Sequence, residues 1–307
     1  VSLGQRPYID FASTQGPVMP YVYALAQPLV NHAGVAGGRL FTILIGFLCS
    51  LGTAWLAARL APPDKRKAAA FVAFALVAVN VYQSYFFAIV KTYALTALFL
   101  VLGFVALTFA DRKRGWGAAV LAGILLSLAT ATRLSAAVVL PVVLVGLLLS
   151  PGGGGGRGVL LASAFAAGAV LTLGLIFVPF WIQAPDAIRF ALLEYHAGRD
   201  PGGMLSILAH KAGFVSRVVQ DYFVAVAILL VAGVVRFVGG QEEGRSDRGG
   251  GLWVLWTSVA AVTALHFFTP FPYDDYQTMI YPVFAAAVAV ALMRWVERAH
   301  EGWAMAL

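Results

Sequence analysis

Residues 40 to 60 read LFTILIGFLCSLGTAWLAARL, and the only charged side chain among them, Arg59, stands next to the end of the run. An α-helix needs about 20 apolar residues to cross the hydrocarbon core of a bilayer, which is about 30 Å thick. The stretch meets this length and places its arginine where the helix would return to water. It is therefore predicted to span a membrane.

The rest of the chain has the same character. Of its residues, 61% are hydrophobic and 11% are charged, whereas a soluble domain has about 45–50% and about 25%. The fold class predicted is all-α, a single polytopic membrane domain over residues 1–307 with no separate soluble domain. About nine spans are expected, at Leu40 to Leu60, Ala68 to Ala88, Thr92 to Ala110, Trp116 to Ala131, Leu134 to Leu149, Val159 to Ile182, Val218 to Val238, Leu252 to Phe268 and Thr278 to Trp295.

The basic residues indicate how these spans are oriented. Many of them gather in alternate connections, at residues 62–67, 111–114 and 241–248. Cytoplasmic connections carry the excess of Lys and Arg. The opposite face then holds a first outer loop at residues 1–39, a long outer loop at residues 183–217 and a last outer loop at residues 269–277. Because nothing carries the first loop outward, we expect one more helix before Val1.

Several classes of function are disfavoured by composition. Cys49, the single cysteine, lies inside the first span, so neither a disulfide nor a zinc cluster is predicted. The net charge of +7 is scattered over short connections, so no nucleic-acid partner is predicted. All 14 acidic residues fall in connections or at helix ends, whereas ion-coupled transporters place ionisable residues inside their spans. Asn80, Gln83 and His266, the main polar residues within spans, are expected to form hydrogen bonds between helices.

Four motifs on the predicted outer side follow one another in order. They are GQRPYIDFASTQGPVMPYVYAL at residues 4–25 with the span that follows it, VKTYALTALFLVLG at 90–103, TATRLSAAVVLPVVL at 130–144 and YDDYQTMIYPVFA at 273–285. Together they resemble the GT-C membrane glycosyltransferases, especially bacterial relatives of the protein O-mannosyltransferases and aminoarabinose transferases. The resemblance extends from Gly4 to about Trp295.

This resemblance implies an activity and a catalytic residue. The activity is transfer of a sugar, with inversion, from a polyprenyl-phosphate donor to an acceptor at the outer face of the membrane. The acid of the first outer loop is the catalytic base in such enzymes, and Asp10 matches it. Protein mannosyltransferases have two adjacent acids where this chain has Ile9, Asp10 and Phe11. The acceptor therefore stays open among lipid, glycan and protein.

The chemistry of the reaction, independently of the resemblance, also gives Asp10 a role as the base. The acceptor hydroxyl must lose a proton as it attacks the anomeric carbon, and a carboxylate that is ionised at neutral pH can take it. The alternative is a solvated loop acid without a catalytic role.

Cations are needed for the phosphate of the donor. Lys91 and Arg133 stand at the predicted outer ends of two helices, and Arg binds phosphate through paired hydrogen bonds. The alternative is that both reach toward lipid headgroups. Tyr93 is a candidate for stacking on a sugar or for the aromatic belt at the membrane boundary.

The long outer loop contains a polar stretch flanked by Gly and Pro. Within it, His196 and Arg199 are candidates for binding the substrate and the donor phosphate. A metal site formed by His196 with Glu194 and Asp200 is less favoured, because the spacing matches no established ligand geometry. An ordinary polar loop is the remaining alternative.

The last outer loop places Asp274, Asp275 and Tyr276 before the final span, as candidates for binding the sugar or the acceptor. They could equally keep a short loop solvated. Two carboxylates do not define a metal site, so no cofactor is predicted with certainty and a divalent cation stays an option.

These observations predict an integral protein of the bacterial cytoplasmic membrane with its active site on the periplasmic or extracellular side. It acts as a hexosyl- or pentosyltransferase on a polyprenyl-phosphate-linked sugar. A flippase or transporter of lipid-linked saccharides is the alternative, because it would bind the same lipid phosphate with the same cations. A membrane scaffold without enzymatic activity is a third alternative.

Overall fold

The computed structural model describes residues 1–307 except 111–114, 150–153, 196–201, 239–250 and 307. The described part is helical, with one isolated bridge between Pro7 and Phe11 and no named strand. This confirms the predicted all-α class. Its longer helices are α3 (Val35–Leu60), α4 (Arg66–Ala78), α6 (Thr92–Leu107), α7 (Trp116–Thr132), α8 (Val139–Leu148), α9 (Gly154–Gln183), α12 (Met204–Asp221), α13 (Phe223–Val238), α14 (Leu252–Phe268) and α15 (Tyr281–Ala306).

The predicted span at Ala68 to Ala88 is two helices. It consists of α4 and the short α5 (Val81–Phe87), which meet at a bend of 70°. Asn80 causes the break, because its backbone is extended and its side chain accepts a hydrogen bond from the backbone N–H of Gln83, at 2.8 Å. Asn is among the residues that most favour this capping position. The new helix therefore begins where its cap stands.

The predicted outer loops are also largely helical where the structure describes them. The first contains α1 (Val18–Ala24) and α2 (Gln27–Ala33) and the first turn of α3. The long outer loop contains α10 (Pro185–Arg189), a π-helical turn η2 (Phe190–Glu194) and most of α12. A bend of 86° separates α12 from α13, so the span predicted to begin at Val218 begins at Phe223.

Length and composition qualify two helices, α3 and α9, as single membrane spans in the described part of the chain. Counting each bent pair as one span gives up to four. Shorter apolar helices accompany them, and α9 exposes large apolar side chains such as Leu171, Leu175 and Ile182. Apolar helices with exposed apolar faces are those of an integral membrane protein. The exact number of spans stays a prediction.

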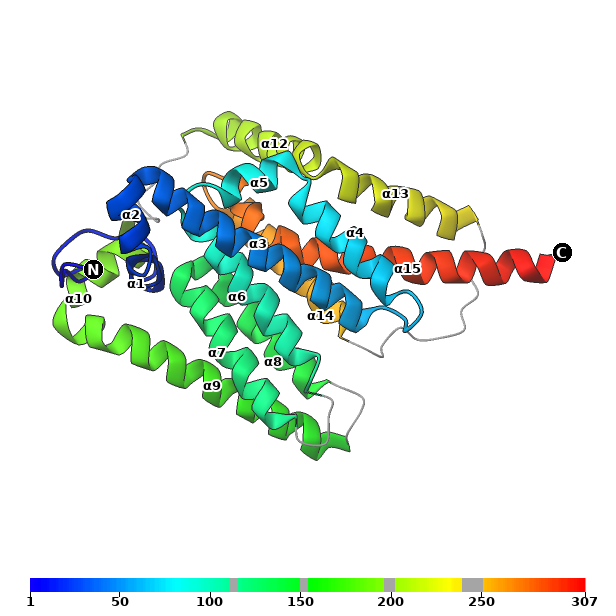
Figure 1. The fold of residues 1–307 in the computed structure, drawn as a ribbon, viewed down its shortest axis with the longest axis horizontal. Helices are drawn as coiled ribbons and strands as arrows, with labels where there is room; N and C mark the ends of the chain where they lie inside the picture. Colours follow the sequence, from blue (N-terminus) through cyan, green and yellow to red (C-terminus); the bar gives the residue numbers. More distant parts are fainter. Residues whose placement is uncertain (111–114, 150–153, 196–201, 239–250, 307) are drawn as a thin grey trace.

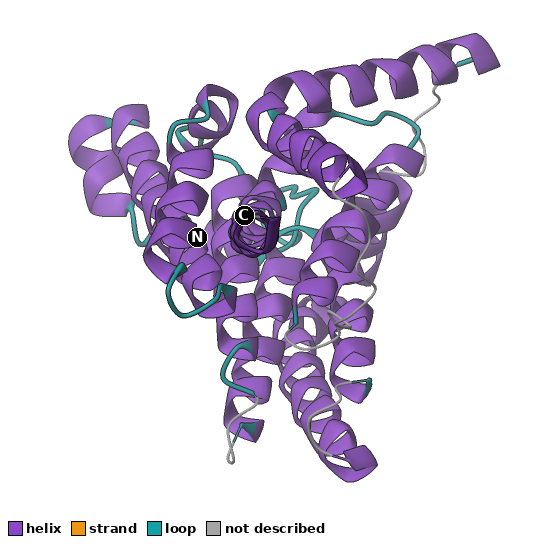
Figure 2. Cartoon of the chain, turned by 90° about the vertical axis from the view of Figure 1, so that its right-hand side faces the viewer, coloured by secondary structure: helices purple, strands orange, loops and turns teal. Residues whose placement is uncertain are grey.

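Small residues bring the helices close together. A Cβ atom at Gly123 of α7 would lie 2.2 Å from the carbonyl oxygen of Phe165 in α9, so only glycine permits this approach. Near the middle of the molecule, α15 is lined by buried alanines and valines and contacts α3, α4, α6, α13 and α14. It is seen end-on in Figure 2 with other helices around it. Close approach through small side chains is typical of helices packed in membranes.

Two short segments complete the frame of the site. A 3₁₀ turn, η1 (Leu134–Val138), joins α7 to α8, and another, η3 (Asp274–Met279), precedes α15. The residues within spans that were predicted to bond between helices do so: Asn80 to the carbonyl of Asp221, Gln83 to that of Thr278, and His266 to the side chain of Gln277.

Candidate active site

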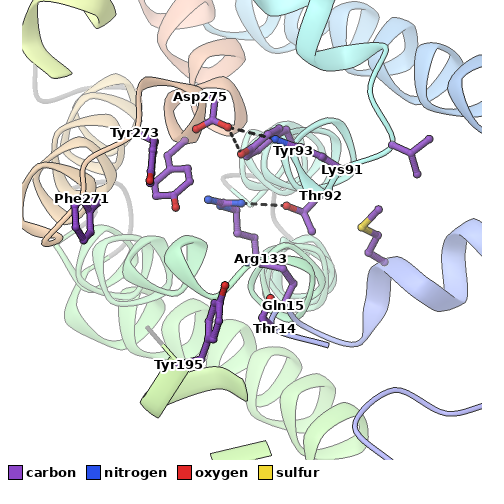
Figure 3. Close-up of a pocket in the computed structure, with 13 residues that line it drawn as sticks. Thr14, Gln15, Lys91, Thr92, Tyr93, Arg133, Tyr195, Phe271, Tyr273 and Asp275 are labelled. Atoms are coloured by element: carbon purple, nitrogen blue, oxygen red, sulfur yellow. Dashed lines mark hydrogen bonds and ion pairs between the residues drawn. The ribbon is translucent and has the colours of Figure 1, made fainter. Parts of the chain in front are cut away.

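One pocket of about 630 Å³ collects residues from segments far apart in the sequence. The first outer loop, the start of α6, the end of α7, the residue after η2 and the η3 region all contribute to it (Figure 3). Its volume is in the range of small-molecule sites. The lining residues are Thr14, Gln15, Met19, Val90, Lys91, Thr92, Tyr93, Arg133, Tyr195, Phe271, Tyr273, Asp275 and Tyr276.

Arg133 forms an inner wall of the pocket. It follows α7 in an extended conformation, and its side chain is only 8% exposed. The guanidinium carbon lies 4.4 Å from the ring centroid of Tyr276 and 4.8 Å from that of Tyr93. Nη1 donates to Thr92 Oγ1 at 3.2 Å, while the buried Nε has no partner among the described residues. The two rings fix the plane of the guanidinium group at the pocket wall. Burial also argues against simple snorkelling to lipid headgroups.

Lys91 stands beside it, immediately before α6, with an extended backbone that ends the preceding segment. Its ammonium nitrogen lies 3.6 Å from Asp275 Oδ2 and 5.4 Å from the ring centroid of Tyr93 (Figure 3). Because the side chain is half exposed, the ammonium group can also reach a ligand in the pocket.

Asp275 contributes a carboxylate to the pocket. Its Oδ2 accepts a hydrogen bond from Tyr93 at 2.6 Å, and its Oδ1 is buried without a partner in the described structure. Tyr93 is 3% exposed, so its ring does not reach the lipid as a belt residue would. It instead connects the two charges, because its hydroxyl holds Asp275 and its ring contacts Arg133.

Asp10 does not line the pocket. It lies in a turn, where its Oδ2 accepts a hydrogen bond from the backbone N–H of Arg6 at 2.7 Å and forms an ion pair with Arg6 Nε at 3.4 Å. Its side chain is 37% exposed. The same loop brings Thr14 and Gln15 to the pocket, four and five residues further on. Its role as a base stays a prediction.

Asp274 points away from the pocket, unlike its neighbour. It accepts hydrogen bonds from the hydroxyl of Tyr82 and, at 2.6 Å, from Arg217 Nε. Burial raises the pKa of Asp274, but these hydrogen bonds outweigh burial and hold the pKa below its usual value. Of the predicted residues in the last outer loop, Asp275 and Tyr276 line the pocket and Asp274 does not.

His196 and Arg199 lie outside the described residues. Tyr195, just before them, lines the pocket, and so do Thr14, Gln15 and Phe271, none of which is predicted from the sequence as a site residue. Threonine, glutamine and phenylalanine in loops carry no signal specific to a site. No group of three metal-ligating side chains occurs among the described residues.

The arrangement suits an anionic ligand with hydroxyl groups. Two cations converge on one cavity, and a carboxylate stands beside them. Guanidinium and ammonium groups bind phosphate, while carboxylates and tyrosines bind sugar hydroxyls.

No protein-family model and no curated protein matches the sequence. Solved structures do resemble the fold. ArnT from Cupriavidus metallidurans in the apo state has a TM-score of 0.64 at 16% identity, over 91% of this chain and 49% of that one. The same protein bound to undecaprenyl phosphate gives 0.61 at 14%, over 93% and 50%.

A third similar structure is an oligosaccharyltransferase from Archaeoglobus fulgidus tethered to an acceptor peptide. It has a TM-score of 0.52 at 14% identity, over 92% of this chain and 42% of that one. The chain thus spans about half the length of the structures it matches. At this identity the likeness concerns the fold, and it confirms the predicted resemblance to GT-C membrane glycosyltransferases at that level.

Proposed function

We propose that this chain is a membrane glycosyltransferase that moves a sugar from a polyprenyl-phosphate donor to an acceptor at the outer face of the membrane. The observation that carries the proposal is the convergence of Lys91 and Arg133 on one pocket, in the fold of enzymes of which one was solved with undecaprenyl phosphate. The membrane proposed is the bacterial cytoplasmic membrane, with the pocket on the periplasmic or extracellular side.

The reaction is a single displacement with inversion. The bond from the anomeric carbon to the phosphate oxygen breaks as the bond to the acceptor oxygen forms. The electron pair stays on the phosphate, whose growing negative charge Arg133 and Lys91 stabilise. The acceptor proton goes to a carboxylate. No proton donor is needed for the leaving group.

Asp10 is proposed as that carboxylate, following the family resemblance. Its Oδ2 is engaged by Arg6 and the residue lies outside the pocket lining, so the carboxylate has to turn toward Thr14 and Gln15 when substrate binds. Catalytic hydrogen bonds are often formed only in the substrate complex. Asp275 already stands in the pocket, and its salt contact with Lys91 favours a role in holding the donor site.

The remaining predicted residues, except Asp274, take binding roles in this proposal. Tyr93, Tyr276 and Asp275 hold Arg133 and Lys91 and offer oxygens to the sugar. Asp274 supports the last outer loop from the side opposite the pocket. His196 and Arg199 are proposed to contact the sugar and the donor phosphate from the segment after Tyr195. The acceptor is a lipid, a glycan or a protein.

Transfer and flipping are separated by following the donor. Membranes containing the full-length protein are supplied with radiolabelled polyprenyl-phosphate hexoses and pentoses and an envelope extract. Label should move into an acceptor. The double variant that carries both Arg133→Gln and Lys91→Gln should abolish both transfer and donor binding. Lys65→Gln, a change of a partly exposed lysine that pairs with Asp64 and does not line the pocket, is the control and should have no effect. Redistribution of intact donor between leaflets without transfer would instead establish a flippase.

A further inference from the structure

The neighbouring carboxylates of η3 are held by different parts of the molecule. Asp275 accepts a hydrogen bond from Tyr93 and forms an ion pair with Lys91 in the pocket. Asp274 accepts a hydrogen bond from Tyr82 of α5 and forms an ion pair with Arg217 of α12. A short 3₁₀ turn therefore joins the pocket to a helix that does not line it.

The α12 helix has three distinct faces. Phe214 is buried against the protein, with Lys211 on the same side donating to the carbonyl of Phe267. Leu208, Val215 and Val219 are exposed and, at 100° per residue, lie on one stripe. Ser216 and Gln220 occupy another side. With its 86° bend from α13, α12 has the character of a helix lying along the membrane boundary.

The end of α12 meets the break between α4 and α5. Asn80, which starts α5, donates through Nδ2 to the carbonyl of Asp221 at 2.7 Å. Tyr82, two residues on, donates to Asp274. One polar cluster therefore contains a helix break, the last turn of α12 and the first residue of η3.

The two ends of η3 are anchored in different ways. At the far end, the buried Gln277 is bonded to His266, at 3.2 Å, and to Thr263, at 3.0 Å, both on α14. At the near end, Asp274 depends on Tyr82 and on the 2.6 Å contact with Arg217, which is 47% exposed. The orientation of the near end, and of Asp275 next to it, is thus the part that α12 can change.

We propose that Arg217 is a positioning residue, which through Asp274 orients Asp275 and with it Lys91 at the donor phosphate. This inference rests on the proposed function. Arg217 itself does not contact the ligand. It fixes the near end of the turn, so that Asp275 faces Lys91 and Tyr93 before the donor arrives. The position of α12 at the membrane boundary then affects the affinity of the pocket for the lipid phosphate.

The test is a double-mutant cycle on donor affinity. Arg217→Gln is expected to raise the KM for the polyprenyl-phosphate sugar about 3- to 10-fold with little change in kcat, since residues remote from a ligand change coupling by such amounts. Arg217→Lys should restore part of the loss. Gln220→Ala, on the same helix and exposed, is the matched control and should leave KM unchanged.

The cycle partner is Lys91→Gln. If Arg217 acts through Asp275 on Lys91, Arg217→Gln should have no further effect on KM once Lys91 has been replaced. Additive effects of the two changes, or a fall in kcat with KM unchanged, would overturn the inference. Should Arg217→Gln fail to accumulate, Asp274→Asn with direct binding of polyprenyl phosphate gives the same comparison.

The inference and the proposed function fail in different ways. If Arg133→Gln and Lys91→Gln leave polyprenyl phosphate binding intact, the proposed function is wrong. If they weaken it while Arg217→Gln and Asp274→Asn do not, only the positioning role of Arg217 is wrong.

Discussion

Arg133 and Asp10 were predicted for the same reaction, but their surroundings differ. Arg133 is enclosed between two tyrosine rings in the wall of the pocket. Asp10 is partly exposed, paired with Arg6 and outside the pocket lining. Arg133 already lines the pocket, whereas Asp10 would have to turn toward it before it could act as the proposed base.

The difference follows from what places each side chain. Arg133 comes directly after a buried helix, so the packing of α7 determines its position. Asp10 belongs to a turn closed by local hydrogen bonds, including Asp10 N to Arg6 O at 2.9 Å. Residues at the ends of packed helices are positioned by the fold, whereas residues in a loop are positioned by neighbours that can exchange.

The largest expected effect comes from removing the enclosed charge. Arg133→Gln should lower kcat/KM for sugar transfer by about 10³-fold, because a preorganised hydrogen-bond donor that stabilises the developing negative charge of the phosphate is lost from a buried site. Arg133→Lys should recover little of it, since an ammonium group cannot replace a planar guanidinium between two rings. Steady-state transfer of labelled sugar measures both. Recovery to near the parental rate would show that only charge matters there.

Asp10→Asn should have the next largest effect. Loss of the base is expected to lower kcat by about 10²-fold or more while donor binding is retained. Asp275→Asn, which removes the charge beside Lys91, should instead act mainly on donor KM. Single-turnover transfer and a donor-binding assay separate the two. If the two variants show the reverse pattern, Asp275 is the base and Asp10 only supports the first loop.

The docking of the first loop is tested at Gly16. A Cβ atom there would lie 1.9 Å from the carbonyl oxygen of Ala131, close to the end of α7. Gly16→Ala should therefore push Thr14 and Gln15 away from Arg133 and destabilise the protein by about 1–3 kcal/mol. Gly117→Ala is the control, because nothing lies within 4 Å of a Cβ at that position in α7. Thermal unfolding in detergent measures both. A melting temperature of Gly16→Ala no lower than that of the parent would mean that the loop does not dock as described.

Much of the fold was predictable because apolar length is visible in a sequence. The helices α3, α6, α7 and α14 match predicted spans within a few residues. The helix α12 was missed because a search for 20 apolar residues does not detect an amphipathic helix. The break at Asn80 was also missed, although its capping residue offered a local signal.

The site was predictable to the extent that helix ends define it. Lys91, Arg133 and Asp275 adjoin packed helices or turns whose order places them on one face, and the structure brings all three to one pocket. The partner of Asp10, and the opposite directions of Asp274 and Asp275, depend on side-chain contacts that spacing does not encode. Tyr195 reaches the pocket through tertiary packing alone.

The smallest expected effect lies in the cluster at the end of α12, and it depends on pH. Burial first, and then the charge of Asp274, raise the pKa of Asp221 to about 6 against the opposing charge of Arg217. The folded protein therefore favours protonated Asp221. This contribution to stability is complete below the pKa of about 4 in an unfolded chain and is lost as pH rises through about 6.

Asp221→Asn cannot ionise, so its melting temperature should match that of the parent near pH 4 and exceed it by about 1–2 °C at pH 8. Asp64→Asn, at an exposed carboxylate, should show no such divergence. A constant difference across this range would mean that Asp221 is ionised throughout. Asp221 of α12 and Asp274 of η3 would then be two charged carboxylates near one arginine, and Arg217 would have to be shared between them.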